Sequence, residues 1–224
     1  MHYQAFSEQI TAGGAVVGCR PDAAVVEGLF GYFNELRRWS AKVNLISREM
    51  ADEELVDKHF VDSLALAGVL GDPGAALLDV GSGAGFPGLV CKIAKPQRPV
   101  RLMEPRLKRV SFLRQVIRSQ GLRDIDVRAC RLEVGSPVGD ERGYRWVVSR
   151  AVTSIGDFLA RCSSLRRPDC RIVCMKGPRS DEELAAVATL PEPWSLEGRH
   201  DYRLPVSGAR RVLLVFRAAE KMDR

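Results

Sequence analysis

The chain has 224 residues, of which 46% are hydrophobic and 28% charged, and its formal net charge is +6 at pH 7. This length allows one large α/β domain with an appended subdomain and a substantial core. No apolar run is long enough to cross a bilayer, and no signal peptide is recognisable, so we expect a cytoplasmic protein without membrane contact. The positive charge favours an anionic partner.

The six cysteines and three histidines are scattered along the chain and never form a C-x-x-C pair. Cys170 and Cys174 flank a predicted strand and are spaced to face the same side of it. We therefore expect them to be buried as small apolar residues rather than to form a disulfide or a metal site. The sequence predicts no metal.

The N-terminal third of the chain is predicted to be helical. Residues 1–20 carry little periodicity, and we expect a loosely ordered leader there. A helical pattern begins at Pro21, and a second helix is expected over 52–70, with acidic residues in its first turn where they favour the helix dipole. We predict an N-terminal helical subdomain over 21–72 and a main domain over 73–224.

From Ala75 onward, predicted strands and helices alternate, which is typical of βαβ units on a mostly parallel sheet. The fold class is therefore α/β and Rossmann-like. The last two strands lack a helix between them, which predicts an antiparallel hairpin at one edge. The predicted strands lie at 75–80, 100–104, 125–130, 145–149, 171–176, 196–203 and 211–217, and the helices near 86–94, 106–120, 154–166 and 180–190.

The run LLDVGSGAGFPG, at 77–88, is the most informative segment of the chain. It reads as a strand, a glycine loop and a helix N-terminus, an arrangement that α/β proteins use to hold nucleotide-like ligands. Gly81, Gly83 and Gly85 accept positive φ and let a ligand approach the backbone closely. Phe86 stands where the dinucleotide fingerprint would place its third glycine, and this argues against NAD.

Two carboxylates add to the cofactor argument. Asp79 precedes the loop and suits a ligand that carries an ammonium group better than one that carries phosphates. Glu104 ends the second strand, nineteen residues after Gly85, where a carboxylate can accept hydrogen bonds from both ribose hydroxyls. Loop and carboxylates together favour S-adenosylmethionine; the alternative is a turn that only packs a helix on the sheet.

Residues after the later strands are expected at the same carboxyl edge of the sheet, where open α/β sheets bind ligands. Leu132 could cover an adenine face while nearby backbone groups or Glu133 meet its polar edge, unless this segment is an ordinary surface loop. Arg150 could bind an anion or a purine edge, or form a structural ion pair. Lys176 could contact phosphate or only end its strand.

The surroundings of these strands narrow the chemistry. The chain has no Asp/Asn-Pro-Pro-aromatic run, which methylation of an exocyclic amine would favour, and no Pro-Cys or Thr-Cys pair for cytosine C5 chemistry. The predicted helix at 106–120 carries a basic face that could hold a phosphate backbone or simply be solvated. Its cations, with those that follow, are Lys108, Arg109, Arg114, Arg118, Arg123, Arg128 and Arg131.

Six segments can be read together: NLIS, KHFVDSL, LLDVGSGAGFPG, KRVSFLRQV, VVSRAV and the MKG turn. In this order they closely resemble the bacterial small-subunit (16S) ribosomal RNA guanine-N7 methyltransferase family, also called the glucose-inhibited division protein B family. KHFVDSL followed by the glycine loop and then SRAV is far more specific than a glycine motif alone. The resemblance extends from about Trp39 to the C-terminal strand.

The resemblance implies a class I S-adenosylmethionine-dependent methyltransferase fold with an N-terminal helical extension. It also implies methyl transfer to N7 of a guanine in 16S rRNA, with the RNA or a ribosomal particle as partner. The family's cofactor positions fall on Gly81, Phe86, Leu132, Glu133 and Arg150, and the general class I pattern adds Gly83, Gly85 and Glu104.

Guanine N7 has a lone pair in the ring plane and no proton to lose, so we expect no catalytic acid or base and a reaction that depends on orientation. His59 and Asp62 could shape the side facing RNA or form a capping or packing pair. Two other functions stay open: a methyltransferase for another RNA, a small molecule or a protein, and a non-catalytic rRNA-binding assembly factor. The oligomeric state is open too, with a monomer expected.

Overall fold

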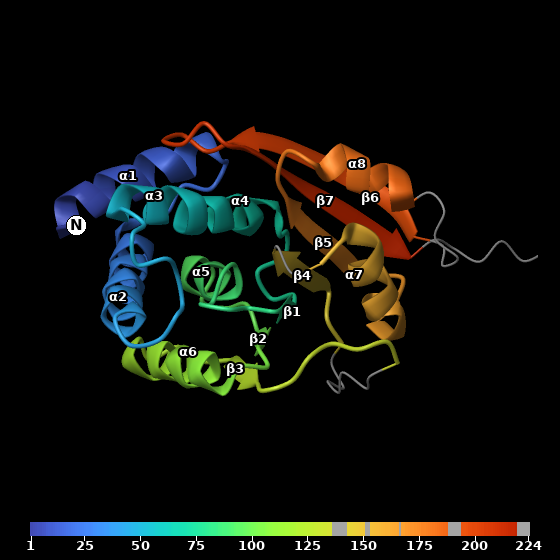
Figure 1. Ribbon diagram of the computed structural model, residues 1–224, viewed down its shortest axis with the longest axis horizontal. Helices are drawn as coiled ribbons and strands as arrows, with labels where there is room; N and C mark the ends of the chain where they lie inside the picture. Colours follow the sequence, from blue (N-terminus) through green and yellow to red (C-terminus); the bar gives the residue numbers. More distant parts are fainter. Residues whose placement is uncertain (136–142, 151–152, 166, 188–193, 219–224) are drawn as a thin grey trace, which may run out of the picture.

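The computed structural model describes residues 1–135, 143–150, 153–165, 167–187 and 194–218. Its centre is a seven-stranded sheet of order β3-β2-β1-β4-β5-β7-β6, shown in Figure 1. The strands from β3 to β5 in this order are parallel, and β7 and β6 are antiparallel to their neighbours. The strands are β1 (Leu77–Val80), β2 (Val100–Met103), β3 (Ile125–Arg128), β4 (Trp146–Arg150), β5 (Arg171–Lys176), β6 (Trp194–Arg203) and β7 (Arg210–Ala218).

The predicted α/β class, with a mostly parallel sheet and an antiparallel edge hairpin, is confirmed. All four residues of β1 are buried, as are the four central residues of β5. Parallel strands that are covered on both faces form continuous apolar runs, which is why these segments were recognisable in the sequence. The edge strand β6 is mostly exposed and carries several charged side chains, which discourage pairing with another sheet edge.

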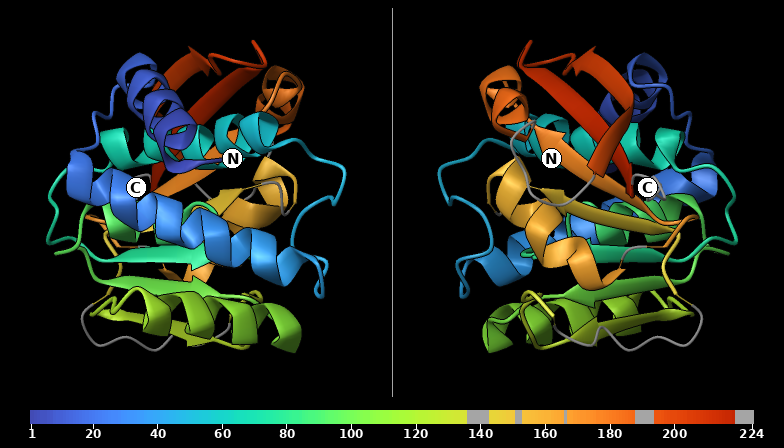
Figure 2. Two further views of the ribbon diagram at one scale, coloured as in Figure 1. Left: turned by 90° about the vertical axis from the view of Figure 1, so that its left-hand side faces the viewer. Right: turned by 90° about the vertical axis from the view of Figure 1, so that its right-hand side faces the viewer.

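Helices cover both faces of this sheet, in two separate hydrophobic clusters. One cluster joins the sheet to α1, α2, α4, α5 and α6, and the other joins the opposite face to α7. Figure 2 views the molecule from opposite sides, with α1 and α2 in front on the left and α7 in front on the right. The α-helices are α1 (Tyr3–Val16), α2 (Ala23–Ser40), α3 (Asp52–Leu55), α4 (Asp62–Val69), α5 (Gly88–Ala94), α6 (Leu107–Ser119), α7 (Ile155–Arg161) and α8 (Ser180–Val187), with a 3₁₀ turn, η2 (Cys162–Leu165).

Cys170 and Cys174 lie in the cluster on the α7 side, together with Cys162. All three are free thiols. Burial raises the pKa of Cys174 to about 12, so its thiol stays protonated and behaves as an apolar group. The predicted burial of Cys170 and Cys174 is confirmed.

The expected loose leader over residues 1–20 is wrong, because helix α1 occupies most of that segment. Phe6 and Ile10 are fully buried, and the Phe6 ring contacts Phe60 at 5.7 Å between centroids. At Gly13 the helix approaches its neighbour so closely that a Cβ would lie 2.6 Å from a methyl of Val61. Phe6, Ile10 and Gly13 lie on one face of the helix. Only Phe6 and Ile10 are large apolar residues, and two such residues are too few to reveal a helical pattern in the sequence.

The predicted helix over 52–70 is present as three consecutive pieces, α3, a π-helical segment η1 (Val56–Val61) and α4. Within η1, the fully buried carboxylate of Asp57 accepts hydrogen bonds from the backbone N–H groups of Val206 and Ser207 in the β6–β7 turn, at 3.1 and 2.9 Å. Isolated π-helical turns inside α-helices are frequent at functional sites. Within the described residues, no helix combines the length and apolar character needed to span a membrane.

Replacing Phe6 by Ala tests whether α1 belongs to the core. The change removes a fully buried ring, so we expect the free energy of unfolding to fall by about 3–5 kcal/mol, measured by urea denaturation. Gln4→Ala, on the exposed side of the same helix, should change it by less than about 0.5 kcal/mol. Equal small effects of both changes would mean that α1 is not part of the cooperative fold.

Candidate active site

The glycine loop between β1 and α5 is fixed by hydrogen bonds to the neighbouring strand. The N–H groups of Gly81 and Ser82 both donate to the carbonyl of Met103, at 2.8 and 3.0 Å. Gly81, Gly83 and Gly85 have φ angles of +75°, +58° and +100°. These values lie in the left-handed region, which side chains other than glycine rarely adopt, so the loop path depends on these three glycines.

The loop forms one wall of a cavity of about 640 Å³ at the carboxyl end of the parallel strands. This volume is in the range of small-molecule sites. Four of the eight residues predicted to bind the cofactor line it: Gly81, Gly83, Phe86 and Arg150. The remaining lining comes from the loop between α2 and α3, from η1 and α4, from α6 and from the ends of β5 and β7, and includes Leu45, Ile46, Met50, Lys58, His59, Asp62, Arg109, Met175, Lys176, Gly177 and Arg211.

Gly85 does not line this cavity and instead allows close packing behind the loop. A Cβ there would lie 2.4 Å from the Leu89 side chain and 2.9 Å from the Tyr32 hydroxyl. That hydroxyl donates to the carbonyl of Ala84 and so connects α2 to the loop. Whether Gly85 also contacts a cofactor stays a prediction.

Glu104 is almost completely buried directly behind the loop. One carboxylate oxygen accepts a hydrogen bond from the N–H of Gly83 at 3.0 Å, and the other accepts from the N–H of Arg106 at 2.8 Å. The guanidinium of Arg109 lies 4.0 Å away. Glu104 therefore organises the segment that lines the cavity, and its contact with a ribose stays a prediction.

Asp79, which the sequence suggests as a partner of a ligand ammonium group, contacts the start of α5, and its contact with a ligand stays a prediction. Its side chain is fully buried outside the cavity lining, and one oxygen accepts from the N–H of Gly88 at the start of α5, at 2.9 Å. The other oxygen is buried without a hydrogen-bond partner among the described residues. Burial raises the pKa of Asp79 to about 6, despite the hydrogen bond from Gly88.

Leu132 and Glu133 lie outside the cavity lining as well. The Leu132 side chain is buried in the cluster on the α7 side, and its carbonyl accepts a hydrogen bond from Arg161 at 3.2 Å. Glu133 is exposed. Their roles toward an adenine stay predictions.

Arg150, at the end of β4, is held by three acceptors from η1 and α4. One guanidinium nitrogen donates to the Lys58 carbonyl at 3.1 Å and to the Asp62 carboxylate at 3.2 Å, and the other lies 2.7 Å from Nδ1 of His59. The guanidinium also stands 5.2 Å from the centre of the Phe86 ring. Arg150 thus forms the ion pair that the sequence left as an alternative, and it does so in the wall of the cavity.

Asp62 joins a second pair of elements to the same cluster. Its other carboxylate oxygen accepts a hydrogen bond from the Tyr202 hydroxyl at 2.8 Å and lies 3.5 Å from Arg211. These two residues come from β6 and β7. Asp62 and His59, left open by the sequence, therefore act through Arg150 and the edge hairpin in shaping the cavity.

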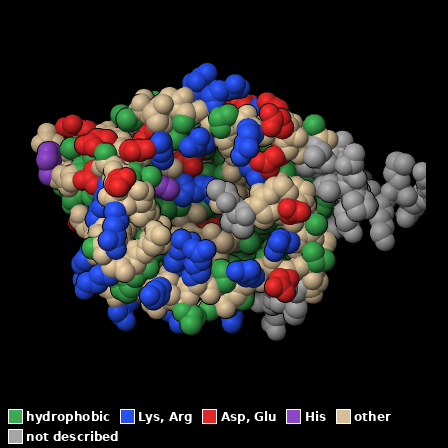
Figure 3. Space-filling model, viewed as in Figure 1, with side chains coloured by type: hydrophobic (Ala, Val, Ile, Leu, Met, Phe, Trp, Pro, Cys, Tyr) green, Lys and Arg blue, Asp and Glu red, His purple; other side chains and the backbone are tan. Residues whose placement is uncertain are grey.

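Cations predominate in the cavity lining, and each of them lies within 4.0 Å of a carboxylate. Among the described lining residues, Asp62 is the single carboxylate, against five cations. Of these cations, Lys176 pairs with Glu183 of α8 at 2.8 Å and donates to the Thr153 carbonyl at 2.6 Å, so it ties the end of β5 to its surroundings. Figure 3 shows Lys and Arg side chains around the central hollow of this face and below it. Such a wall attracts an anionic substrate.

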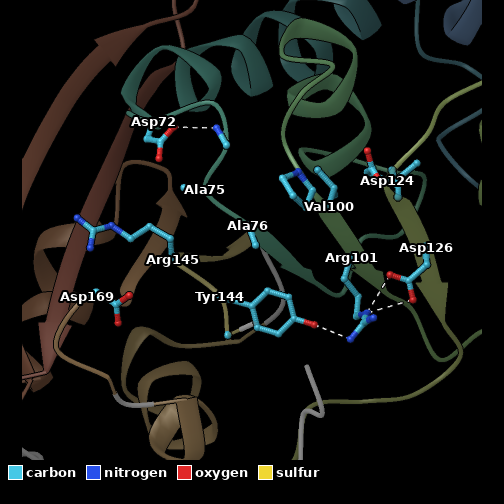
Figure 4. A pocket seen from close by; sticks show the side chains of 14 residues that line it. Asp72, Ala75, Ala76, Val100, Arg101, Asp124, Asp126, Tyr144, Arg145 and Asp169 are labelled. Carbon is cyan, nitrogen blue, oxygen red and sulfur yellow. Dashed lines mark hydrogen bonds and ion pairs between the residues drawn. The ribbon is translucent and has the colours of Figure 1, made fainter. Parts of the chain in front are cut away.

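A larger cavity, of about 850 Å³, lies at the opposite, amino edge of the sheet, and Figure 4 shows it. One of its cations is paired within the cavity, since Arg101 donates to Asp126 at 2.9 Å and also to the Tyr144 hydroxyl at 2.8 Å. No predicted site residue lines it within the described parts of the chain. Open α/β sheets bind ligands at the carboxyl ends of strands, so the smaller cavity is the candidate active site.

No group of three His, Cys, Asp or Glu side chains is arranged to hold a metal ion in the part of the chain that the structure describes. The cavity does suit a nucleoside-like cofactor at its glycine loop. Gly81 and Gly83 expose backbone without a Cβ, and the Glu104 carboxylate lies directly behind Gly83.

The sheet order and the glycine loop define a Rossmann-like fold, the class of fold that many methyltransferases have. Solved structures share the fold: TrmN from Thermus thermophilus has a TM-score of 0.56 and 18% identity, over 73% of this chain and 53% of that chain. The ribosomal protein L11 methylase from Lactobacillus delbrueckii subsp. bulgaricus has a TM-score of 0.52 and 11% identity, over 73% and 79%.

More specifically, the chain belongs to the GidB family, rRNA small subunit methyltransferase G, whose family model matches residues 26–213. The ribosomal RNA small subunit methyltransferase G of Desulfotalea psychrophila is 40% identical over 95% of this chain and 98% of its own length. That of Myxococcus xanthus is 40% identical over 94% and 96%. The predicted family and the predicted methyltransferase fold are confirmed.

The sequence did not indicate that Leu45, Ile46 and Arg211 line the cavity, or that Tyr202 binds Asp62. The NLIS segment, which includes Leu45 and Ile46, contributed to the family resemblance, but nothing local placed it beside the glycine loop. Tyr202 and Arg211 reach Asp62 only because the edge hairpin folds over α4.

His59 gives the site a testable pH dependence. Burial, and then the positive charges of Arg150, Arg211 and Lys58, lower the pKa of His59 to about 3. The hydrogen bond supports a neutral ring, because a guanidinium only donates and Nδ1 must accept. In the unfolded chain a histidine titrates near pH 6.5. As the pH falls below 6.5, the unfolded chain therefore binds a proton that the folded chain does not, and stability is lost.

We expect His59→Gln to remove this loss. Between pH 7 and pH 5, the free energy of unfolding of the wild type should decrease by about 2 kcal/mol more than that of the variant. Urea denaturation at both pH values measures the difference. Because both proteins keep Asp79 and every other titrating group, the comparison isolates His59. Parallel pH profiles would mean that His59 protonates equally in the folded and unfolded chains.

Proposed function

We propose that this chain transfers a methyl group from S-adenosylmethionine to N7 of a guanine in small-subunit (16S) rRNA. The observation that carries the proposal is the junction, in one cavity, of a glycine loop of nucleotide-binding form with a wall of cations. Relatives named ribosomal RNA small subunit methyltransferase G support the RNA substrate. With such a substrate, we propose that the chain acts in the cytoplasm and as a monomer.

The reaction requires little of the side chains. S-adenosylmethionine supplies an electrophilic methyl group, and guanine N7 supplies an in-plane lone pair and carries no proton. A bond from N7 to the methyl carbon forms as the bond from sulfur to carbon breaks, so no base is needed. Residues of the chain then act by orienting the base and excluding water.

Arg150 is proposed to position the cavity wall rather than to move a proton. Both terminal nitrogens of its guanidinium are engaged by Lys58, His59 and Asp62, and its face rests near Phe86. An arginine is not deprotonated in proteins, so it has no proton to give at neutral pH. Its fixed position holds Phe86 and the glycine loop in place against η1.

The test of the reaction uses purified protein, methyl-labelled S-adenosylmethionine, and ribosomal particles or extracted rRNA from a strain that lacks this chain. We expect the label to appear in small-subunit RNA as 7-methylguanosine. Cleavage of the RNA at the modified nucleotide locates its position. Label in another RNA, in protein or in a small molecule would contradict the proposed substrate. Stable RNA binding without any transfer would favour the non-catalytic assembly factor.

The glycine loop can be tested with a matched pair of substitutions, Gly83→Val and Gly121→Val. The two glycines have nearly the same φ, +58° and +59°, so valine should lower stability by a similar amount, about 1–2 kcal/mol, at each. Gly83 lines the cavity, whereas Gly121 lies in a turn with nothing within 4 Å of its Cβ position. By calorimetry, only Gly83→Val should lose S-adenosylmethionine binding, by more than tenfold. Equal cofactor affinity of the two variants would refute the loop assignment.

A further inference from the structure

A further depression, separate from the two cavities described above, lies between the end of α2 and the middle of α6. We call it the Trp39 groove; its volume is about 480 Å³, and its lining residues are Arg38, Trp39, Lys42, Val43 and Gln115. None of these also lines the active-site cavity. The Trp39 ring is partly exposed and packs on Phe112 at 5.8 Å between centroids, so its orientation is fixed from below.

The groove is bordered by cations. The side chain of Arg38 is 63% exposed, although it pairs with Glu35. Lys42 is exposed, and its ammonium has no hydrogen bond or ion pair to any residue that the structure describes. Helix α6, which forms the other side, has no acidic residue. Figure 3 shows Lys and Arg side chains gathered over this lower part of the face. The α6 cations are Lys108, Arg109, Arg114 and Arg118.

The same surface leads from the groove to the active-site cavity. Trp39 lies beside Phe112, in the middle of α6. Five residues further along the chain, the Asn44 carbonyl accepts a hydrogen bond at 3.4 Å from Arg109, near the start of α6. Arg109 lines the cavity, and so does Leu45, the residue that follows Asn44. The segment 39–45 therefore runs along α6 from the groove to the cavity.

We propose that the Trp39 groove binds an unpaired base of the RNA substrate, next to the nucleotide that enters the active-site cavity. Trp39 would stack on the base, while Arg38 and Lys42 would bind the phosphates on either side. Exposed aromatic rings flanked by cations are the contacts that proteins make with single-stranded RNA. A guanine that enters a cavity must leave its own stack, so its neighbours become available for such contacts. This inference rests on the proposed function for the identity of the RNA.

The test measures the KM for RNA and the affinity for S-adenosylmethionine separately, for Trp39→Leu, Trp39→Phe and Lys42→Ala. Leucine keeps an apolar contact with Phe112 but removes the stacking face, so we expect the KM for extracted small-subunit rRNA to rise about tenfold, with the affinity for S-adenosylmethionine unchanged. Phenylalanine, which keeps a ring, should have a smaller effect. Lys42→Ala should weaken RNA binding and reduce its salt dependence by about one ion.

Lys95→Ala is the charge-matched control, because Lys95 is exposed at the end of α5 on the opposite edge of the sheet. It should leave both RNA binding and its salt dependence unchanged. Thermal unfolding shows whether each variant is folded; if Trp39→Leu is not, Trp39→Phe and Lys42→Ala decide the result.

The outcomes separate the groove from the proposed function. If the wild type methylates rRNA and the Trp39 variants do so with an unchanged KM for RNA, the groove proposal is overturned. If the wild type does not methylate rRNA, the proposed function fails, and filter binding of the same RNA by wild type and variants then decides the groove independently. A defect seen with intact ribosomal particles but not with extracted rRNA would indicate a protein contact and would also overturn the proposal.

Discussion

The arrangement of the active-site cavity depends on one ion pair, between Arg150 and Asp62. Both side chains are largely withdrawn from water, with exposed fractions of 18% and 4%. Removing two charges from water is unfavourable unless their remaining hydrogen-bonding groups are satisfied. Here the Lys58 carbonyl and His59 Nδ1 accept hydrogen bonds from the guanidinium, and the Tyr202 hydroxyl donates one to the carboxylate. The pair therefore holds together β4, the helical run from η1 to α4 and the edge hairpin, which are far apart in the sequence.

The N-terminal helices are consequently part of the catalytic unit rather than an appendage. Beyond the Arg150 cluster, the fully buried carboxylate of Asp57 binds two backbone N–H groups of the β6–β7 turn. A single hydrophobic cluster continues from α1 and α2 through α4 to the central strands. We therefore propose that the boundary expected near residue 72 separates two chain segments of one cooperative structure, and that the first segment supplies one side of the substrate cavity.

Local features of the sequence sufficed for the sheet and for the glycine loop, because buried parallel strands are continuous apolar runs and the alternating glycines interrupt one of them abruptly. The same signals led to Gly81, Gly83 and Phe86, which line the cavity, and Arg150 followed from its place at a strand end. They could not reveal that Asp62 is the partner of Arg150, since that contact joins residues 88 positions apart. Helix α1 was missed because small and polar residues dilute its apolar stripe.

Aromatic rings of the helical layer form a continuous row of contacts from α1 to the cavity. Phe6 contacts Phe60 at 5.7 Å, and Phe60 contacts Phe86 at 5.1 Å between ring centres. Phe86 in turn faces both His59 and the Arg150 guanidinium. Rings packed in this way resist changes in size one at a time. A change of size at any of these phenylalanines therefore forces its neighbour to repack, so a substitution in the first turns of α1 can shift the wall of the active-site cavity without touching it.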